Sequence, residues 1–291
     1  MFEEKYPLRR DPYPMYIDGS WVIPAGGESF PVVDPNTNET IGSIARAGTA
    51  EVEAAVRAAR RAFDGGPWPS MTPRDRGILL GKTADIVEKN LEKLAYLESL
   101  DTGKVIMQAI HFDLPQGIDG LRYYCGKARD IHGEISDTAV PGFWNYRLWQ
   151  PVGVVLEILP WNGPLMMGLQ KVAGILAAGN TVIIKPPSDA SLALVEAVKA
   201  FEEAGFPNGV VNLVTGPGAT VGEELARHPG IDMISVTGST ATGARVMEIA
   251  SRSIKKLALE LGGKNPNIVF EDSDIDAAVE AARDAAFNNQ G

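Results

Sequence analysis

The chain has 291 residues, a formal net charge of −10, and 45% hydrophobic against 22% charged residues, which is the composition of a globular protein of about two domains. The acidic charge argues against nucleic acid as the main partner, and no apolar run is long enough to cross a bilayer. Cys125 is the only cysteine, so an intrachain disulfide is excluded and a reducing compartment is favoured. Because the N-terminus lacks the apolar core of a signal peptide, we expect a cytoplasmic protein.

The N-terminal part is predicted to contain two strand pairs followed by helices. After a polar arm over residues 1–13, Asp18-Gly19 suits the tight turn of a hairpin. Thr49 and Thr72 have the form of helix caps. The expected elements are a hairpin over 15–22, strands over 30–33 and 40–45, helices from Thr49 and from Thr72 to about Asn90, a helix ending near Gly103 and a long helix over 112–131.

Residues 138–150 interrupt the helical region with an alternating, aromatic-rich sequence, TAVPGFWNYRLWQ. The alternation favours a projecting hairpin over a core strand. A surface meander fits the same residues about equally well, so the residues by themselves leave both open.

From residue 151 the chain alternates strands and helices. Residues 152–159 form an apolar run typical of a strand buried on both faces, and Pro160, which has no N–H for a ladder, ends it. Pro164 favours a helix start and Gly179 a helix end before the next strand, which predicts a right-handed parallel crossover. This period indicates an α/β fold with a doubly wound parallel sheet, that is, a Rossmann-like domain. The strands after the first are expected over 181–185, 210–214, 233–236, 254–259 and 267–270, and the helices over 165–178, 189–204, 219–228, 239–251 and 273–289.

Several residues fall where such a sheet binds ligands, at the carboxyl ends of its strands. Asn162 follows one strand and Lys185 ends the next, with a turn asparagine and a solvated lysine as the alternatives. Two glycine-rich turns, 214–222 with the spacing GxGxxxG and 237–243, leave helix N–H groups free for an anion, although either could be a plain helix start. Glu260 stands where an apolar strand meets two glycines, a setting that suits a general base, with a surface glutamate as the alternative.

Together these segments resemble the aldehyde dehydrogenase superfamily, in the order and close to the spacing of its motifs, over the whole chain. No single segment is specific, but the combination is. The matching segments are Pro160-Trp161-Asn162-x-Pro164, Lys185-Pro186, Gly216-x-Gly218-x-x-x-Gly222, Gly238-Ser239-Thr240, Glu260-Leu261-Gly262-Gly263-Lys264 and Phe287-Asn288-Asn289-Gln290-Gly291.

The resemblance implies oxidation of an aldehyde to a carboxylic acid with NAD or NADP, through a cysteine thiohemiacetal and thioester. Asn162 matches the family's oxyanion donor, and Glu260 matches the general base that activates the thiol or the hydrolytic water. The residues expected to bind the cofactor are Leu159, Pro160, Trp161, Lys185, Ser188, Gly218, Gly222, Thr237, Gly238, Ser239, Leu261 and Gly262.

Ser188 departs from the pattern of many NAD-preferring relatives, which have a glutamate three residues after the lysine. A carboxylate there accepts a hydrogen bond from the ribose 2′-OH and repels a 2′-phosphate. Because serine removes that repulsion, we expect NADP+ to be accepted, although Asp189 could occupy the same space.

The resemblance also divides the chain. A cofactor-binding domain is expected over 1–137 and 151–259, an oligomerisation hairpin over 138–150, and the beginning of a second α/β catalytic domain over 260–291. The family's nucleophilic cysteine would lie three residues beyond Gly291, so the chain looks like the front part of a family member and is expected to be inactive alone. The alternatives are a truncated pseudo-enzyme and a nucleotide-binding or scaffold protein without turnover.

The expected partners are a small aldehyde and further copies of the chain in a homodimer or homotetramer, with no nucleic acid and no membrane. His111, His132 and His228 show no ligand spacing, so no catalytic metal is predicted. Cys125 lies in a helical pattern far from the family's nucleophile position, where such a cysteine serves packing. The residues do not identify the aldehyde.

Overall fold

The computed structural model describes residues 2–290, so Met1 and Gly291, the outer ends of the first and last predicted domains, lie outside it. Within this range the core is a seven-stranded sheet in the order β11-β10-β7-β8-β9-β1-β2. The strands from β11 to β9 run parallel, and β1 joins them antiparallel to β9. Their bounds are β11 (Lys256–Leu261), β10 (Met233–Gly238), β7 (Val154–Ile158), β8 (Thr181–Lys185), β9 (Val211–Leu213), β1 (Met15–Ile17) and β2 (Ser20–Val22).

The sheet is wound in two directions from β7. The chain passes from β7 through β8 to β9, and then returns to place β10 and β11 on the other side of β7. The strand order therefore reverses between β7 and β10, where ligand crevices open in sheets of this class. The predicted α/β doubly wound fold is confirmed, with one correction: the sheet is mixed, because the N-terminal hairpin extends it antiparallel.

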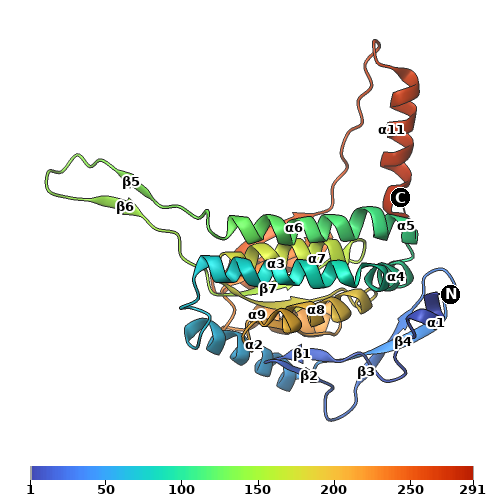
Figure 1. Ribbon diagram of the computed structural model, residues 1–291, viewed down its shortest axis with the longest axis horizontal. Coiled ribbons are helices and arrows are strands. Elements are labelled where there is room, and N and C mark those ends of the chain that lie inside the picture. Colours follow the sequence, from blue (N-terminus) through green and yellow to red (C-terminus); the bar gives the residue numbers. More distant parts are fainter. Residues whose placement is uncertain (1, 291) are drawn as a thin grey trace.

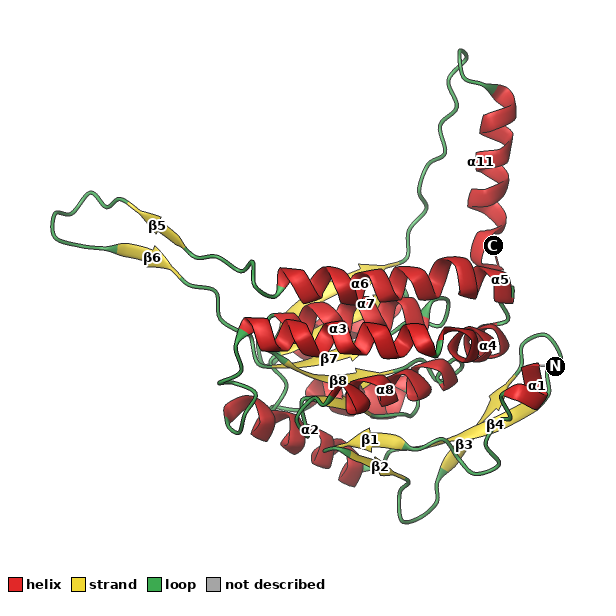
Figure 2. Ribbon diagram, in the orientation of Figure 1, coloured by secondary structure: helices red, strands yellow, loops and turns green. Residues whose placement is uncertain are grey.

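Helices cover both faces of the sheet, as Figure 2 shows. Val182 and Ile184 of β8 belong to one hydrophobic cluster and Ile183 to the other, because successive side chains of a strand point to opposite faces. Every residue of β8 is buried, which explains its continuous apolar sequence. The first cluster includes α3 (Pro73–Lys89), α4 (Leu91–Thr102), α6 (Leu114–Lys127), α7 (Pro164–Ala177) and α8 (Leu192–Ala204), and the second includes α2 (Thr49–Asp64), α9 (Glu223–Arg227) and α10 (Thr240–Ser251).

Helix α6 packs against both α7 and α3, and glycines allow the close approach (Figure 1). A Cβ added at Gly117 would lie 2.8 Å from Leu169 Cδ1. A Cβ added at Gly77 would lie 2.4 Å from the backbone carbonyl oxygen of Cys125, and no side-chain rotation can relieve a contact with backbone. Cys125 is half-buried in this contact, which agrees with the packing role expected for it.

The N-terminal strand pairs form as predicted. Asp18 and Gly19 have φ of 54° and 77°, the left-handed conformation that the turn between β1 and β2 requires. Helix α2 differs in detail: the amide of Gly48 donates to the Glu51 carboxylate at 2.8 Å, so Gly48 is the cap and Thr49 the first helical residue. The predicted polar arm contains a short helix. These further elements are α1 (Phe2–Lys5), β3 (Ser29–Val33) and β4 (Thr40–Ala45).

A hairpin projects from the body between α6 and β7 (Figure 1, green). Its strands, β5 (Glu134–Ser136) and β6 (Asn145–Arg147), pair antiparallel, so the hairpin forms and the meander does not. The hairpin begins before residue 138, because the helix predicted over 112–131 ends at Lys127. That helix is preceded by α5 (Ile106–Gln108) and by η1 (Ala109–Asp113), a π-helical turn.

The segment after β11 leaves the body (Figure 1, red). The strand predicted over 267–270 is wrong: a strand needs a neighbour to complete its hydrogen bonds, and in the described part of the chain none lies beside it. The predicted helix is present as α11 (Ile275–Phe287), followed by η3 (Asn288–Gln290), and α11 has no buried residue. The helix predicted over 219–228 is divided into η2 (Gly218–Gly222) and α9.

Candidate functional site

The loop after β7 carries Asn162 to the point where the strand order reverses. Leu159 and Pro160 are buried, and the Leu159 amide donates to the Lys185 carbonyl at 3.2 Å, which ties the ends of β7 and β8 together. Trp161 is 58% exposed, and Asn162 beside it is exposed as well. The side chain of Asn162 is therefore accessible to a ligand.

A cleft of about 330 Å³ lies between the ends of β7 and β8, the turn after β9 and the start of α10. Ile158, Lys185, Gly218 and Gly222 line it. A Cβ added at Gly218 would meet no atom within 4 Å, and one at Gly222 would approach Lys185 Cε to 4.0 Å, so both glycines keep this space open. The remaining lining residues are Ala219, Glu223, Ala241, Thr242, Arg245 and Val246.

Lys185 is buried at the end of β8 rather than solvated. Burial lowers the pKa of its ammonium to about 8, and the charge of Asp189 opposes this shift. The hydroxyl of Ser188 donates to the Gly216 carbonyl at 3.3 Å and so joins the turns after β8 and β9. The predicted lysine, serine and glycine positions are thus neighbours on one edge of the sheet.

The end of β10 forms the other side of the reversal point. Ser239 Oγ accepts a hydrogen bond from the Thr242 amide at 3.1 Å, so Ser239 is a helix cap, as the alternative interpretation had it. The amides of Thr240 and Ala241, which precede Thr242 in the first helical turn, have no acceptor within the helix and can meet an anion. The hydroxyl of Thr237 is buried and has no hydrogen-bond partner among the described residues, while Gly238 ends the strand.

Glu260 lies inside β11 and pairs with Thr237 of β10. The predicted domain boundary between 259 and 260 therefore falls within a strand. Glu260 is exposed because β11 is the edge strand, so the apolar setting expected for it is not formed by the described residues. Leu261 pairs with Gly238, and Leu261 and Gly262 are exposed like Glu260.

These features fit a dinucleotide. A buried ammonium, two open glycines and a helix N-terminus surround one cleft at the reversal point of a parallel sheet, and each of them can meet a ribose or a phosphate. Comparison with known protein families decides the relationship: the sequence model of the "Aldehyde dehydrogenase family" matches residues 21–291. The chain belongs to the aldehyde dehydrogenase family. Members of this family are oxidoreductases with an NAD-binding, Rossmann-like domain.

Two curated aldehyde dehydrogenases illustrate the similarity. Betaine aldehyde dehydrogenase of Bacillus subtilis (strain 168) is 43% identical over 277 residues, which are 95% of this chain and 56% of that protein. Aldehyde dehydrogenase family 2 member B4, mitochondrial, of Arabidopsis thaliana is 45% identical over 281 residues, 95% of this chain and 52% of that protein. The chain therefore spans about half the length of the curated relatives it matches.

A solved aldehyde dehydrogenase gives the same result for the fold. The NAD+ complex of the enzyme from Bacillus cereus superposes with a TM-score of 0.94 at 40% identity, over 98% of this chain and 58% of that one. Within the part of the chain that the structure describes, no helix is long and apolar enough to cross a membrane. No group of three or more histidine, cysteine or acidic side chains in that part is placed to hold a metal ion.

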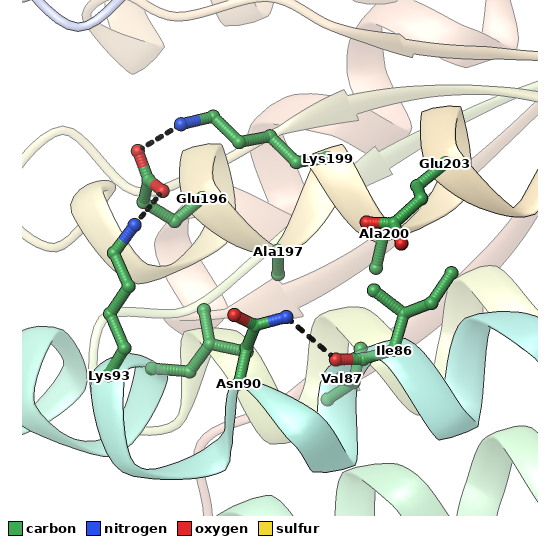
Figure 3. Close-up of a pocket in the computed structure, with 10 residues that line it drawn as sticks. Ile86, Val87, Asn90, Lys93, Glu196, Ala197, Lys199, Ala200 and Glu203 are labelled. Atoms are coloured by element: carbon green, nitrogen blue, oxygen red, sulfur yellow. Dashed lines mark hydrogen bonds and ion pairs between the residues drawn. The ribbon is translucent and has the colours of Figure 1, made fainter.

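A second cleft, of about 140 Å³, lies between α3, α4 and α8, and it contains none of the predicted aldehyde dehydrogenase residues. In Figure 3 Lys93 and Lys199 point to different oxygens of Glu196, at 2.6 Å each. Burial opposes ionisation of Glu196, but these two ammonium groups outweigh it and hold the pKa of the carboxyl below its usual value. The cluster ties α4 to α8 and supplies no group to the dinucleotide cleft.

Three buried charged residues beside the Asn162 loop are not indicated by the sequence. Glu98, Lys104 and Asp113 occur in or next to helices whose pattern predicts ordinary surface positions, and only the packing of separate elements brings them together. Glu157 lies inside β7. The apolar pattern predicts that this strand is buried, but it does not indicate which group the Glu157 carboxylate contacts. The isolated acidic residue in an apolar run was the available signal.

Proposed function

We propose that the complete protein oxidises an aldehyde to a carboxylic acid with NAD+ or NADP+. The register of β7, β10 and β11 carries the proposal: Val236 of β10 faces Ile158 on one side and Leu259 on the other. The Asn162 loop therefore follows one of the strands that flank β10, and Glu260 lies near the carboxyl end of the other. An amide donor and a carboxylate beside a cleft that suits a dinucleotide are the groups that acyl chemistry on an aldehyde needs.

In this proposal the nucleophile is the cysteine that the family motif places three residues beyond Gly291. Its thiolate forms a C–S bond to the aldehyde carbon while the carbonyl electrons move to oxygen, and the Asn162 side-chain amide donates to that oxyanion. When bound, NAD(P)+ accepts the hydride of this carbon, which leaves a thioester. Glu260 then removes a proton from water, whose oxygen attacks the thioester and releases the acid and the thiolate.

The cofactor would be held by the edge residues already described. Lys185 and Ser188 would meet the adenosine ribose, Trp161 and Ser239 the pyrophosphate, and Gly218 and Gly222 would leave room for the adenosine. Leu159, Pro160, Thr237, Gly238, Leu261 and Gly262 would complete the contacts. The absence of a carboxylate at Ser188 supports acceptance of NADP+ as well as NAD+.

The projecting hairpin supports a homo-oligomer, either a dimer or a tetramer. Its side chains Phe143, Trp144, Tyr146 and Trp149 are exposed in the single chain, and aromatic patches of this kind are typical of subunit contacts. We also propose the domain division given above, with the hairpin extended to residue 134 and the second boundary moved from 259 to the end of β11 at Leu261. We further propose a cytoplasmic location, where the thiol nucleophile would stay reduced.

The proposal is tested in the protein extended to the full length of its relatives. Replacing the oxyanion donor, Asn162→Ala, should lower kcat by about 10²- to 10³-fold while NAD(P)+ still binds. Glu260→Gln should slow release of the acid and allow the acyl-enzyme to accumulate. Cofactor binding without any NAD(P)H production from a panel of aldehydes would contradict the proposal and favour a pseudo-enzyme or scaffold.

A further inference from the structure

A buried charge cluster lies against the loop that carries Asn162. The side chain of Lys104 is fully buried, and its ammonium donates to Asp113 Oδ2 at 2.6 Å. The same ammonium donates to the backbone carbonyl oxygen of Asn162 at 2.9 Å, and it lies 3.6 Å from Glu98 Oε1. Three separate parts of the chain therefore meet at one nitrogen atom.

Local chemistry holds Lys104 in this position. Gly103, with φ of 78°, ends α4 in the left-handed conformation, and the Ser99 hydroxyl donates to the Lys104 carbonyl at 2.6 Å. Asp113 is the last residue of η1, in which the Leu114 amide reaches back to the Ala109 carbonyl. This wider turn precedes Pro115, which has no N–H to donate, and it leaves Asp113 buried.

One ammonium and two carboxyl groups meet in this buried cluster. Burial raises the pKa of Glu98 to about 7, and the nearby charge of Lys104 opposes that shift. Burial thus opposes a full negative charge on Glu98 beside the Lys104–Asp113 ion pair. An ammonium in such surroundings makes stronger hydrogen bonds than it would at the surface, because no solvent competes for its protons.

We propose that Lys104 is a positioning residue for Asn162: its ammonium holds the Asn162 carbonyl and thereby aims the side-chain amide at the developing oxyanion. The inference rests on the proposed function of Asn162. The Asn162 side chain is exposed, so its direction depends on the loop backbone. A fixed donor is worth far more to a transition state than one that must first be oriented.

A purely structural ion pair is the competing explanation. The hydrogen bond from Lys104 to Asp113 is enough to attach Lys104 to η1, and this bond involves no residue of the loop after β7. The bond to the Asn162 carbonyl is the feature that a structural role does not require. The two explanations make different predictions for a variant that keeps the fold but lacks the bond from Lys104 to the Asn162 carbonyl. Only the positioning role predicts a lower kcat.

The test uses the full-length enzyme with the neutral triple variant Glu98→Gln, Lys104→Met and Asp113→Asn. This change removes the donor without leaving a buried carboxylate unpaired, which Lys104→Met alone would do. Lys93→Met is the matched control, because Lys93 lies on α4, the helix that ends just before Lys104, and its ammonium pairs with Glu196 instead of the loop. Both variants are also made in the Asn162→Ala background.

The triple variant should lower kcat by about 10- to 100-fold, less than loss of the amide itself, and should leave KM for NAD(P)+ within about threefold. In the Asn162→Ala background it should lower kcat by no more than about threefold further, because the amide it would misalign is gone. Lys93→Met should change kcat little. An unchanged kcat, or an equal loss with and without Asn162, would overturn the positioning role.

Amide hydrogen exchange gives a readout independent of catalysis. The Met167 amide, which donates to the Gly163 carbonyl at 3.0 Å, should exchange about tenfold faster or more in the triple variant and be unaffected by Lys93→Met. If Asn162→Ala leaves kcat intact, the proposed oxyanion role fails on its own, and the exchange rate still decides whether Lys104 holds the loop. Unchanged exchange at the Met167 amide would overturn the inference even then.

Discussion

The carboxylate of Glu157 lies 3.7 Å from the ammonium of Lys171, inside the sheet and against α7. Glu157 is fully buried, and burial raises its pKa to about 7, against the charge of Lys171. The same ammonium lies 3.2 Å from the Ser235 hydroxyl of the neighbouring strand. A carboxyl of this kind makes the stability of the fold depend on pH.

Glu157→Gln should raise the free energy of unfolding at pH 8 by about 1–3 kcal/mol. The unfolded carboxyl ionises near pH 4.5 and the folded one only near pH 7, so the stability that Glu157 contributes is complete below pH 4.5 and is lost between these values. The difference in free energy of unfolding between the variant and the unaltered protein should therefore vanish toward pH 4.5. Urea unfolding at several pH values measures this difference, with Glu280→Gln on the exposed face of α11 as control. A difference independent of pH would contradict the prediction.

Lys185→Met should weaken binding of NAD(P)+ by about 10- to 100-fold, because a charged donor to the ribose is lost. The free energy of unfolding should stay the same or rise at pH 7. Burial disfavours the charged form of Lys185, whose pKa is lowered to about 8, and methionine has a similar shape without the charge. Fluorescence titration and thermal unfolding separate the two effects. Lys199→Met, which removes a half-exposed lysine of α8, should leave cofactor affinity unchanged.

Ser188→Glu should shift the cofactor preference toward NAD+. The new carboxylate would repel a 2′-phosphate, and kcat/KM with NADP+ should fall by about tenfold or more while that with NAD+ is kept. Ser188→Ala removes only the hydrogen bond to the Gly216 carbonyl and should change the ratio by less than about threefold. A strong NAD+ preference in the unaltered protein would show that Asp189 already acts as the repelling group.

Gly77→Ala should destabilise the protein by about 1–3 kcal/mol, although alanine favours a helix over glycine by about 1 kcal/mol. The added Cβ would lie 2.4 Å from the Cys125 carbonyl oxygen and force α3 and α6 apart. Gly126→Ala is the matched control on α6, where an added Cβ meets no atom within 4 Å. The denaturant midpoints compare the two, and an equal shift would contradict the packing argument.

Replacing Trp144 and Trp149 by serine should reduce the oligomer to smaller species without unfolding it. These side chains are 83% and 67% exposed in the single chain, so the fold does not depend on them. Light scattering during size-exclusion chromatography measures the mass. Tyr123→Ser, which removes an exposed aromatic from α6, should leave the mass unchanged. An unaltered mass in the double variant would place the subunit contact elsewhere.

Much of the fold follows from local chemistry. Strand β8 was predicted with its observed bounds, because a β-branched run lies between Gly179-Asn180 and Pro186. Helix α3 begins where Thr72 and Pro73 indicate, and the Thr72 hydroxyl accepts from the Asp75 amide. Backbone preference, capping and turn chemistry act over a few residues, so a sequence displays them directly.

The amino-acid sequence predicts the alternation of strands and helices from β7 to β11, the family resemblance and the chain positions of Asn162 and Lys185. Only the tertiary structure decided which charges are buried: Lys104 meets Asn162 across a sequence separation of 58 residues, and Glu260 is exposed on an edge strand. Burial depends on what packs over a residue from remote parts of the chain, and no local pattern records it. For that reason the sequence names candidate residues for the site, but it does not indicate the buried charges that contact the Asn162 loop.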